Sequence, residues 1–533
     1  MWISVIATLH KAISSRMRKY ALLAVGLILL TLAIAHASPS SRRLVYKVEV
    51  GECGNALVTV TFTASMPGNL SLYLPKFTRV DVVEVVGSFK WVKNESAGYW
   101  YNYCTFAYTP GSEGDFLVSF RYKFPYASLL IDDNAWFMTP LIGANDDVPV
   151  EVRVTLPDFK ELTYSNVKPT LMEDGEFCFH LVRTSEGARV VITYKLTRTV
   201  ESSSISKTVD GMEIVVEGSP CYTEFMNKVA DVLVNCAPYL EEAFGELADK
   251  VEFKFFLPER MDIYTHGYVF GEDINFGGKG PIHLNLALIR FAPGYLETTV
   301  VHEYVHLALG RAGIEANTEL RWFHEGVAQY VSMEACKRAG YDLSLIEEDY
   351  KEGVKELLAI RDENFGFLQR WRPMPGEQGL YYMASYYIFS YLAERYGGLS
   401  FVKKIVEISR ERGGISTNAE LIKVLSLAAG EDLTPLFRRW GFNVEEVGEI
   451  PLKDREVKIP PYLVIVAIVV VVVAVAIAIY GVATSVKRRR EERRGYIRCP
   501  YCGAVVRADF AFCPYCGAPL RPITELEGYY GAY

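Results

Sequence analysis

The chain has 533 residues, too many for a single hydrophobic core, so two to four domains are expected. Its net charge is −8, yet residues 1–43 carry six basic and no acidic groups, and residues 484–533 carry nine basic and five acidic ones. The stretch between them is therefore strongly acidic, which argues against nucleic acid as its partner.

An apolar segment lies close to the start of the chain, over residues 21–35. Three basic residues between positions 16 and 19 precede it, and Ala35-His36-Ala37 ends it. A basic flank, a short apolar stretch and small residues at positions −3 and −1 predict a secretory signal peptide over residues 1–37. The alternative is an uncleaved anchor helix, although the segment is short for a membrane span.

Residues 44–200 are rich in alternating and β-branched stretches. Examples are residues 57–62, 116–122 and 148–156, and turn residues such as Pro67-Gly68-Asn69 separate them. Many short strands between turn signals predict a β-sandwich domain.

Residues 205–445 are predicted to form a second, mostly helical domain. Helical periodicity runs from about residue 222 to 247, and residues 251–256 and 282–286 are expected to be strands. From there the pattern is mostly helical to about Trp440. Residues 446–460 carry charges and prolines, and we expect a linker there.

A second apolar segment sets the expected topology. No residue between Ile459 and Val486 is charged, and four basic residues follow at 487–490. This length and composition predict a transmembrane helix over residues 461–483. By the positive-inside rule, the acidic part of the chain lies outside the cell and the tail lies in the cytoplasm.

Disulfides are permitted in the part of the chain that is predicted to lie outside. Six cysteines allow 15 complete pairings, and the sequence leaves them open. Two of them should not pair with each other if one helix joins them, because 15 residues of helix place Cys221 and Cys236 roughly 22 Å apart. The six are Cys53, Cys104, Cys178, Cys221, Cys236 and Cys336.

One short motif points to metal chemistry. His302 and His306 are four residues apart, so on a helix their imidazoles project from one face and can hold one metal ion. Glu303 follows the first histidine, where its carboxylate can reach a water molecule on that metal. We expect it to act as general base on that water.

A third ligand is predicted downstream, in Trp322-Phe323-His324-Glu325-Gly326-Val327-Ala328. Eighteen residues separate His306 from Glu325, enough for the first helix to end and a second helix to return. Two histidines and one glutamate leave the fourth position of a zinc ion open for water, as a catalytic site requires.

The sequence at these positions resembles the gluzincins, the thermolysin-like clan of metallopeptidases. The spacing and the W-x-x-E-G-x-A pattern are similar to those of the aminopeptidase-N-like, or peptidase MA-like, families, including the glycyl aminopeptidases. The resemblance implies a thermolysin-like catalytic domain with His302, His306 and Glu325 as zinc ligands and Glu303 as general base. It covers residues 295–440 well and the β-rich region more loosely.

The same resemblance extends to the stretch that begins at Tyr382. In the family, a tyrosine in this pattern donates a hydrogen bond to the oxyanion of the tetrahedral intermediate, and we transfer that role to Tyr382. Packing is the alternative, because Tyr381, Tyr386 and Tyr387 crowd the same stretch.

The sequence departs from the family at the position that binds a free amino terminus. The aminopeptidase-N family carries G-x-M-E-N upstream, and residues 271–275 are only a faint echo of it. Strict aminopeptidase activity is therefore in doubt. The strand at 282–286 is expected to receive an extended substrate as an added strand.

The remaining polar neighbours of the motif are given supporting roles. His324 is adjacent to Glu325, and side chains at i and i+1 of a helix point apart, so we expect His324 to support the site rather than to bind metal. Gln329, four residues after Glu325, could orient a ligand or lie on the helix surface.

The tail carries two C-P-Y-C-G knuckles. Four thiolates from two C-x-x-C turns predict a tetrahedral structural zinc site, and the segment 497–520 resembles a zinc ribbon. Two redox dithiols are the alternative. A closed site of this kind has no open position for catalysis. The expected ligands are Cys499, Cys502, Cys513 and Cys516.

Together these features predict an α+β multidomain chain. It comprises an N-terminal β-sandwich, a thermolysin-like mostly helical catalytic domain, one transmembrane helix and a small zinc ribbon. The expected function is a membrane-anchored extracellular zinc peptidase with one catalytic and one structural Zn²⁺. Its expected partners are a peptide or protein substrate, membrane lipid and a cytoplasmic protein for the ribbon. The alternatives are a strict aminopeptidase or a non-catalytic surface protein that binds or scaffolds.

Overall fold

The computed structural model describes the greater part of the chain. The chain divides into two compact units, residues 1–450 and 451–533. The described residues are 42–145, 148–173, 175–444, 495–500, 502–510, 513–516, 518 and 520. The predicted signal peptide (1–37), linker (446–460) and transmembrane helix (461–483) therefore lie outside the described residues. Within the described part, every helix is too short or too polar to cross a bilayer.

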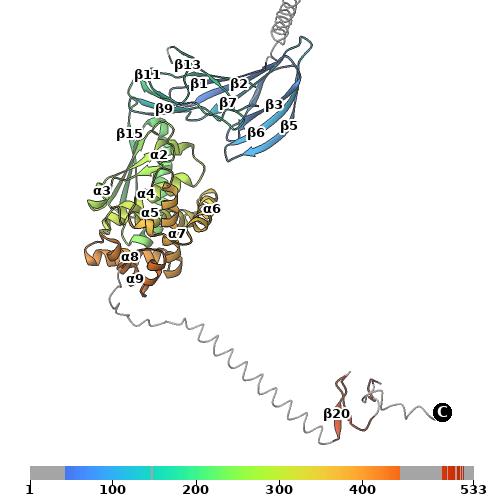
Figure 1. Ribbon diagram of the computed structural model, residues 1–533, viewed down its shortest axis with the longest axis vertical. Coiled ribbons are helices and arrows are strands. Elements are labelled where there is room, and N and C mark those ends of the chain that lie inside the picture. Colours follow the sequence, from blue (N-terminus) through green and yellow to red (C-terminus); the bar gives the residue numbers. More distant parts are fainter. Residues whose placement is uncertain are drawn as a thin grey trace, which may run out of the picture. The chain divides into compact units, whose positions relative to one another are not determined.

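The first 14 strands, β1 to β14, make the N-terminal part β-rich, as predicted (Figure 1). They form three sheets, with strand orders β12-β13-β10-β1-β2-β7-β4, β11-β14-β9-β8 and β3-β6-β5. The strands are β1 (Arg43–Val50), β2 (Ala56–Ala64), β3 (Gly68–Pro75), β4 (Asp81–Val86), β5 (Ser88–Ala97), β6 (Tyr101–Thr109), β7 (Phe116–Phe124), β8 (Ser128–Ile131), β9 (Asn134–Met138), β10 (Val150–Thr155), β11 (Phe159–Ser165), β12 (Leu171–Glu173), β13 (Glu176–Leu181) and β14 (Val191–Leu196).

The alternating sequence explains how these strands bury one face. In β1, Leu44, Tyr46 and Val48 are fully buried, while the residues between them are at least partly accessible. Because side chains in a strand alternate between faces, this pattern places every second residue in the core. Alternation does not specify a partner strand, so the sequence did not distinguish three sheets from the two of a simple sandwich.

A five-stranded sheet begins the second region, with order β15-β16-β17-β19-β18. Strands β16, β17 and β19 are parallel, and the short β18 pairs antiparallel with β19 at the edge. The prediction that the strand at 282–286 receives substrate is therefore wrong, because this strand, β19, already pairs with β17 on one side and with β18 on the other. The strands are β15 (Ser203–Val209), β16 (Met212–Gly218), β17 (Lys250–Phe256), β18 (Gly267–Tyr268) and β19 (Pro281–Asn285).

Helices make up most of the chain after this sheet, as predicted, and in Figure 1 they run from green to orange. A single large core joins them to the sheet. The α-helices are α2 (Thr223–Phe244), α3 (Gly271–Asn275), α4 (Tyr295–Arg311), α5 (Arg321–Arg338), α6 (Ser344–Arg361), α7 (Gln378–Tyr396), α8 (Leu399–Arg412), α9 (Asn418–Ala429) and α10 (Thr434–Arg439), and the 3₁₀ turns are η1 (Pro220–Tyr222), η2 (Leu286–Arg290) and η3 (Gly366–Gln369).

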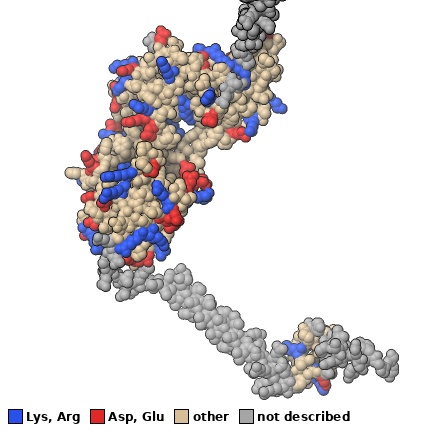
Figure 2. All heavy atoms as spheres, viewed as in Figure 1, with Lys and Arg blue, Asp and Glu red and all other residues tan. Residues whose placement is uncertain are grey.

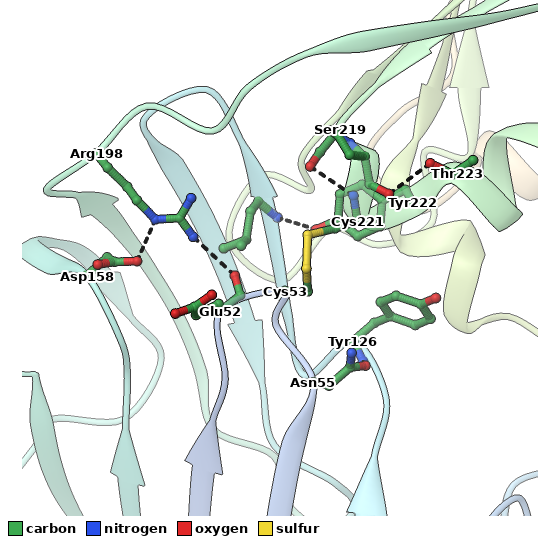
Figure 3. The surroundings of a disulfide bond; sticks show 12 residues. Glu52, Cys53, Asn55, Tyr126, Asp158, Arg198, Ser219, Cys221, Tyr222 and Thr223 are labelled. Atoms are coloured by element: carbon green, nitrogen blue, oxygen red, sulfur yellow. Dashed lines mark hydrogen bonds and ion pairs between the residues drawn. A yellow bond between two sulfur atoms is a disulfide. The ribbon is translucent and has the colours of Figure 1, made fainter.

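The two regions are joined covalently and through shared packing (Figure 3). A disulfide links Cys53, between β1 and β2, to Cys221 in η1. Cys221 therefore does not pair with Cys236, as the helix length requires. Next to the disulfide, Leu130 N donates to the Tyr222 hydroxyl at 2.8 Å. Trp136 of β9 belongs to the core of the second region, so the two predicted domains pack as one compact unit.

The surface of the described residues carries both signs of charge. Figure 2 shows basic and acidic side chains interspersed over the visible face of the larger unit. In the tail unit, β20 (Tyr496–Arg498) pairs antiparallel with β21 (Val505–Arg507).

Candidate metal centre

The histidine pair lies on α4, a helix buried around most of its circumference. The carboxylate of Glu297 accepts a hydrogen bond from Gly294 N at 2.8 Å, which satisfies a free amide at the start of the helix. One turn apart on α4, the rings of His302 and His306 lie with centroids 4.9 Å apart. The helical spacing that the sequence predicted therefore places both imidazoles on one face.

The third candidate ligand comes from α5, and a glycine fixes how closely α7 approaches it. A Cβ atom at Gly326 would lie 2.5 Å from the carbonyl oxygen of Ser385 on α7, so only glycine fits there. This close approach explains in physical terms why glycine follows Glu325. It also brings the first turns of α7, with Tyr382, toward the metal-binding side chains.

The structure brings His302, His306 and Glu325 together, with one ligand atom of each within 4.8 Å of the others. Glu325 Oε2 lies 3.2 Å from His302 Nε2 and 3.6 Å from His306 Nε2. Two donors bound to one tetrahedral zinc ion at about 2.0–2.2 Å lie roughly 3.3–3.6 Å apart. The distances from Glu325 to the two imidazoles therefore match the spacing of ligands on one zinc ion.

The electrostatics of the three residues also suit a cation. Burial alone would raise the pKa of Glu325, but hydrogen bonds from His302 and His306 hold that pKa well below its usual value. Glu325 is therefore ionised in the neutral range. Burial likewise raises the pKa of Glu303, and the two histidines only partly oppose the shift. A carboxylate with a raised pKa is a better proton acceptor.

Glu303 lies beside the edge strand of the sheet. A Cβ atom at Gly267 in β18 would lie only 2.9 Å from Glu303 Cγ, so the strand backbone passes directly over this side chain. The sequence placed Glu303 next to the metal but did not reveal this contact. A glycine before Tyr268 is the only local signal for it.

His324 lies behind the candidate ligands and contacts His306. Its Nε2 lies 3.2 Å from the carbonyl oxygen of Ile314, and its Nδ1 lies 3.5 Å from His306 Nδ1. A carbonyl oxygen only accepts, so Nε2 of His324 carries the proton and its Nδ1 accepts from His306. Burial lowers the pKa of His324 to about 3, with His306 adding to the shift, which keeps the ring neutral. Nε2 is then the ring nitrogen of His306 that faces Glu325 and can bind a metal.

Gln329 contacts the other imidazole, that of His302, as His324 contacts that of His306. It forms a side-chain hydrogen bond with His302, which favours the orienting role over a surface position. Burial would lower the pKa of His302, but the hydrogen bond that its ring donates to Glu325 and the charge of Glu303 raise it overall.

A cavity of about 310 Å³ opens on the three ligands. Tyr382 lines it, and so does Arg321, which the sequence analysis missed. Arg321 Nε lies 3.2 Å from Glu325 Oε1, and its guanidinium also contacts Tyr382 and stacks over the Trp371 ring. Its position four residues before Glu325 on the same helix was the available signal. Burial raises the pKa of Tyr382 to about 12, so its hydroxyl remains a proton donor.

The cavity holds few acidic groups. Among the described residues that line it, the carboxylates are Glu303 and Glu325, and the predicted metal site already involves both. Glu272, in the faint echo of the amino-terminus motif, is exposed on α3 and does not line the cavity. The described wall thus offers no further carboxylate to a free amino group.

A third group of possible ligands was missed by the sequence analysis. Strand pairing between β10 and β13 brings Glu151 beside Cys178 and His180. Both oxygens of Glu151 are already engaged, by Arg43 and Arg153. This carboxylate is neutralised by protein and is a poor candidate for a metal ligand.

The four tail cysteines lie together, as predicted. Sγ of Cys499 lies 3.7 Å from that of Cys516, and Sγ of Cys502 lies 3.7 Å from that of Cys513. Sulfurs bound tetrahedrally to one zinc ion at about 2.3 Å are roughly 3.8 Å apart, so the spacing fits. The positive φ of Gly503 and its hydrogen bond to Cys499 O shape the first knuckle.

Comparisons with known proteins match the tail to a family and find a distant likeness for the larger part of the chain. A zinc-ribbon domain family matches residues 495–520. No curated protein matches the chain. Among solved structures, the chain is similar to an aminopeptidase N family protein from Idiomarina loihiensis, with 12% identity over 76% of each chain and a TM-score of 0.35. The tail is thus assigned to the zinc ribbons by sequence as well as by geometry.

Proposed function

We propose that the chain is a zinc-dependent peptidase that hydrolyses peptide bonds with activated water. One observation carries the proposal: His302, His306 and Glu325 lie at zinc-ligand spacing, on a cavity that Glu303 also lines. These residues would hold a zinc ion, which would supply Lewis acidity and lower the pKa of a bound water toward neutrality.

Glu303 is the general base in this proposal. Its carboxylate accepts a proton from the attacking water and then carries that proton to the leaving amine. Burial, which raises its pKa, suits it to both steps. Gln329 and His324 hold the two imidazoles in place from behind.

Two side chains on the cavity wall can stabilise the negative charge that develops on the substrate carbonyl. The hydroxyl of Tyr382 is protonated and faces the cavity, and the neighbouring guanidinium of Arg321 adds positive charge. A donor of this kind is often worth about 2.7–4 kcal/mol in the transition state.

The edge strand supports the proposed substrate class, peptides. Strand β18 pairs on one side only with β19, and its residues Gly267 and Tyr268 line the cavity. An extended peptide can add to this edge through main-chain hydrogen bonds. Because the described wall lacks a spare carboxylate for a free amino terminus, we propose cleavage within peptides rather than strict aminopeptidase action.

The proposal places the enzyme at the outer face of a membrane, on the strength of the two apolar segments in the sequence. The zinc ribbon then lies in the cytoplasm, where its closed four-cysteine site has a structural role and its surface is available to a protein partner. No nucleic acid is expected as a partner.

The test is a Glu303→Gln variant of the full chain, assayed on a peptide library alongside wild type. The variant should lose at least about a thousandfold in cleavage and keep its bound zinc, because glutamine cannot accept the proton. Unchanged cleavage would refute the role of Glu303. Absence of cleavage in both proteins, with zinc bound, would support the non-catalytic surface protein instead. Comparing free with N-acetylated substrates separates endopeptidase from aminopeptidase action.

A further inference from the structure

A second cavity, of about 480 Å³, lies where the β-rich region meets the second region. It shares no lining residue with the cavity at the candidate metal centre. Its volume falls within the range of small-molecule sites, about 300–1,000 Å³. About half of the described residues that line it are aromatic, among them Phe77, Trp100, Tyr101, Phe124, Trp136 and Phe291.

Two arginines are the charged groups among the described residues that line this cavity, Arg189 and Arg290. The guanidinium of Arg290 stacks over the rings of Phe124, at 5.0 Å, and Trp136, at 5.6 Å. Its Nη1 is buried and has no hydrogen-bond partner within the described chain. Arg189 lies over the Tyr101 ring and donates to the carbonyl oxygen of Thr139.

The two positive charges are not neutralised by the protein. Neither arginine forms an ion pair with a described carboxylate, and the two repel each other. Burial, with Arg189 adding to the shift, lowers the pKa of Arg290 to about 9. Stacking on aromatic rings returns less than the hydration that a buried charge gives up. An anion in the cavity would supply the missing partner.

The cavity lies next to the proposed active site along the chain. Met261, Ile263 and Tyr264 line it, and only a few residues later Gly267 and Tyr268 line the metal-centre cavity. Between them, the ring of His266 packs edge-on against Phe291 at 4.9 Å. Thr265 and His266 thus lie in the chain between the residues that line the two cavities.

We propose that this cavity is a binding site for an amphipathic carboxylate, in which the guanidinium of Arg290 pairs with the carboxylate and the aromatic wall holds an apolar body. The planar guanidinium matches a carboxylate through two parallel hydrogen bonds. The apolar wall disfavours small, strongly hydrated anions such as inorganic phosphate. Two sources offer this chemistry: the C-terminal residue of a peptide, and a free aromatic or aliphatic acid.

The binding test uses the full chain with Glu303→Gln, so that it does not depend on catalysis. The probes are N-acetyl-L-phenylalanine and its amide, which lacks the charge, titrated by calorimetry. The carboxylate should bind at least about tenfold more tightly than the amide, and Arg290→Leu should remove that preference. Arg361→Leu is the matched control, because Arg361 also stacks on a ring, Phe367, and has a buried Nε without a partner.

Arg189→Gln provides a second variant in case Arg290→Leu does not fold, and it should weaken carboxylate binding by severalfold. Equal binding of the acid and the amide would overturn the proposal, as would wild-type affinity in both arginine variants. Loss of binding after zinc is removed by a chelator would place the carboxylate at the metal and also overturn it. Equal binding of inorganic phosphate would contradict the role of the aromatic wall.

A kinetic experiment distinguishes the two possible ligands, the C-terminal residue of a peptide and a free acid. Wild type is assayed on a peptide that ends in phenylalanine, with a free and with an amidated terminus. If the cavity holds the peptide end, amidation should lower kcat/KM about tenfold in wild type and have no effect in Arg290→Leu. If kcat/KM is unchanged while N-acetyl-L-phenylalanine still binds, the ligand is a free acid. A chain that cleaves no peptide would refute the proposed function, and the binding arm would still decide this site.

Discussion

In the tail, the sulfurs of four cysteines from residues 499–516 lie close together, whereas in the larger unit three donors from two helices lie on one side of a cavity. Both groups have the spacing of zinc ligands. They differ in what occupies the fourth position: a fourth cysteine in the tail, and open space in the larger unit. The contrast is the one expected between a closed structural zinc site and a zinc site open to substrate, which we propose for the larger unit.

The largest expected effect comes from removing one cysteine of the tail, which should disrupt the tail site and leave the site in the larger unit intact. Cys513→Ser should unfold the tail unit, since zinc binding of about 10–16 kcal/mol is also the folding free energy of small zinc domains. Hydrogen exchange of the tail amides measures the loss. Peptide cleavage should stay within about twofold of wild type, and Cys178→Ser in β13 serves as the control. A parallel loss of cleavage would mean that the two sites are not independent.

The next effect concerns the open side of the larger site. Tyr382→Phe should lower kcat by about a hundred- to a thousandfold, or ~2.7–4 kcal/mol, because one donor to the oxyanion is lost. Zinc content should not change. Tyr386→Phe, on the same helix and packed against Tyr350 at 4.8 Å, is the control. Equal activity of the two variants would show that Tyr382 is a packing residue and does not stabilise the oxyanion.

The contact between α5 and α7 predicts a smaller effect. Gly326→Ala places a Cβ against the Ser385 carbonyl and should lower the free energy of unfolding by about 1–3 kcal/mol. Because α7 also carries Tyr382, kcat should fall as well. Gly379→Ala, where a Cβ meets nothing within 4 Å, should be neutral or slightly stabilising. Thermal unfolding and cleavage assays of both variants check this, and identical behaviour would exclude the close contact.

The smallest effect is expected at His324, which lies behind the candidate ligand His306. His324→Leu removes the acceptor for His306 Nδ1 and should weaken zinc binding at the larger site about tenfold, or ~1.4 kcal/mol. The 3.5 Å distance is long for a hydrogen bond, which keeps the effect small. His324→Gln retains an acceptor oxygen and should recover part of the affinity. Competition with a zinc chelator measures both variants, and equal affinity in the two would show that this contact does not position His306.

The two sites also differ in how far the sequence could predict them. All tail ligands come from two adjacent turns, so local spacing was sufficient. On α4, the spacing of His302 and His306 was equally local. The place of Glu325 depends on how α5 packs, and the resemblance to known peptidases supplied it. Arg321 could have been found as the residue one turn before Glu325.

Other features depend on long-range contacts that no local pattern encodes. The acceptor role of His324 needs the carbonyl of Ile314, and the group at Glu151 needs the register of β10 with β13. The strand β18 has only two residues, too few for a periodic signal, and so the edge position was assigned to the wrong strand. The cavity with Arg290 forms only when the two regions pack together.

The amount of zinc bound per chain tests the central claim most directly. Two sites of the kind described should give two zinc ions per wild-type chain after removal of free metal, measured by plasma mass spectrometry. The double variant His302→Ala, His306→Ala should keep one, held by the tail. One zinc ion in wild type, or two in the double variant, would contradict the account.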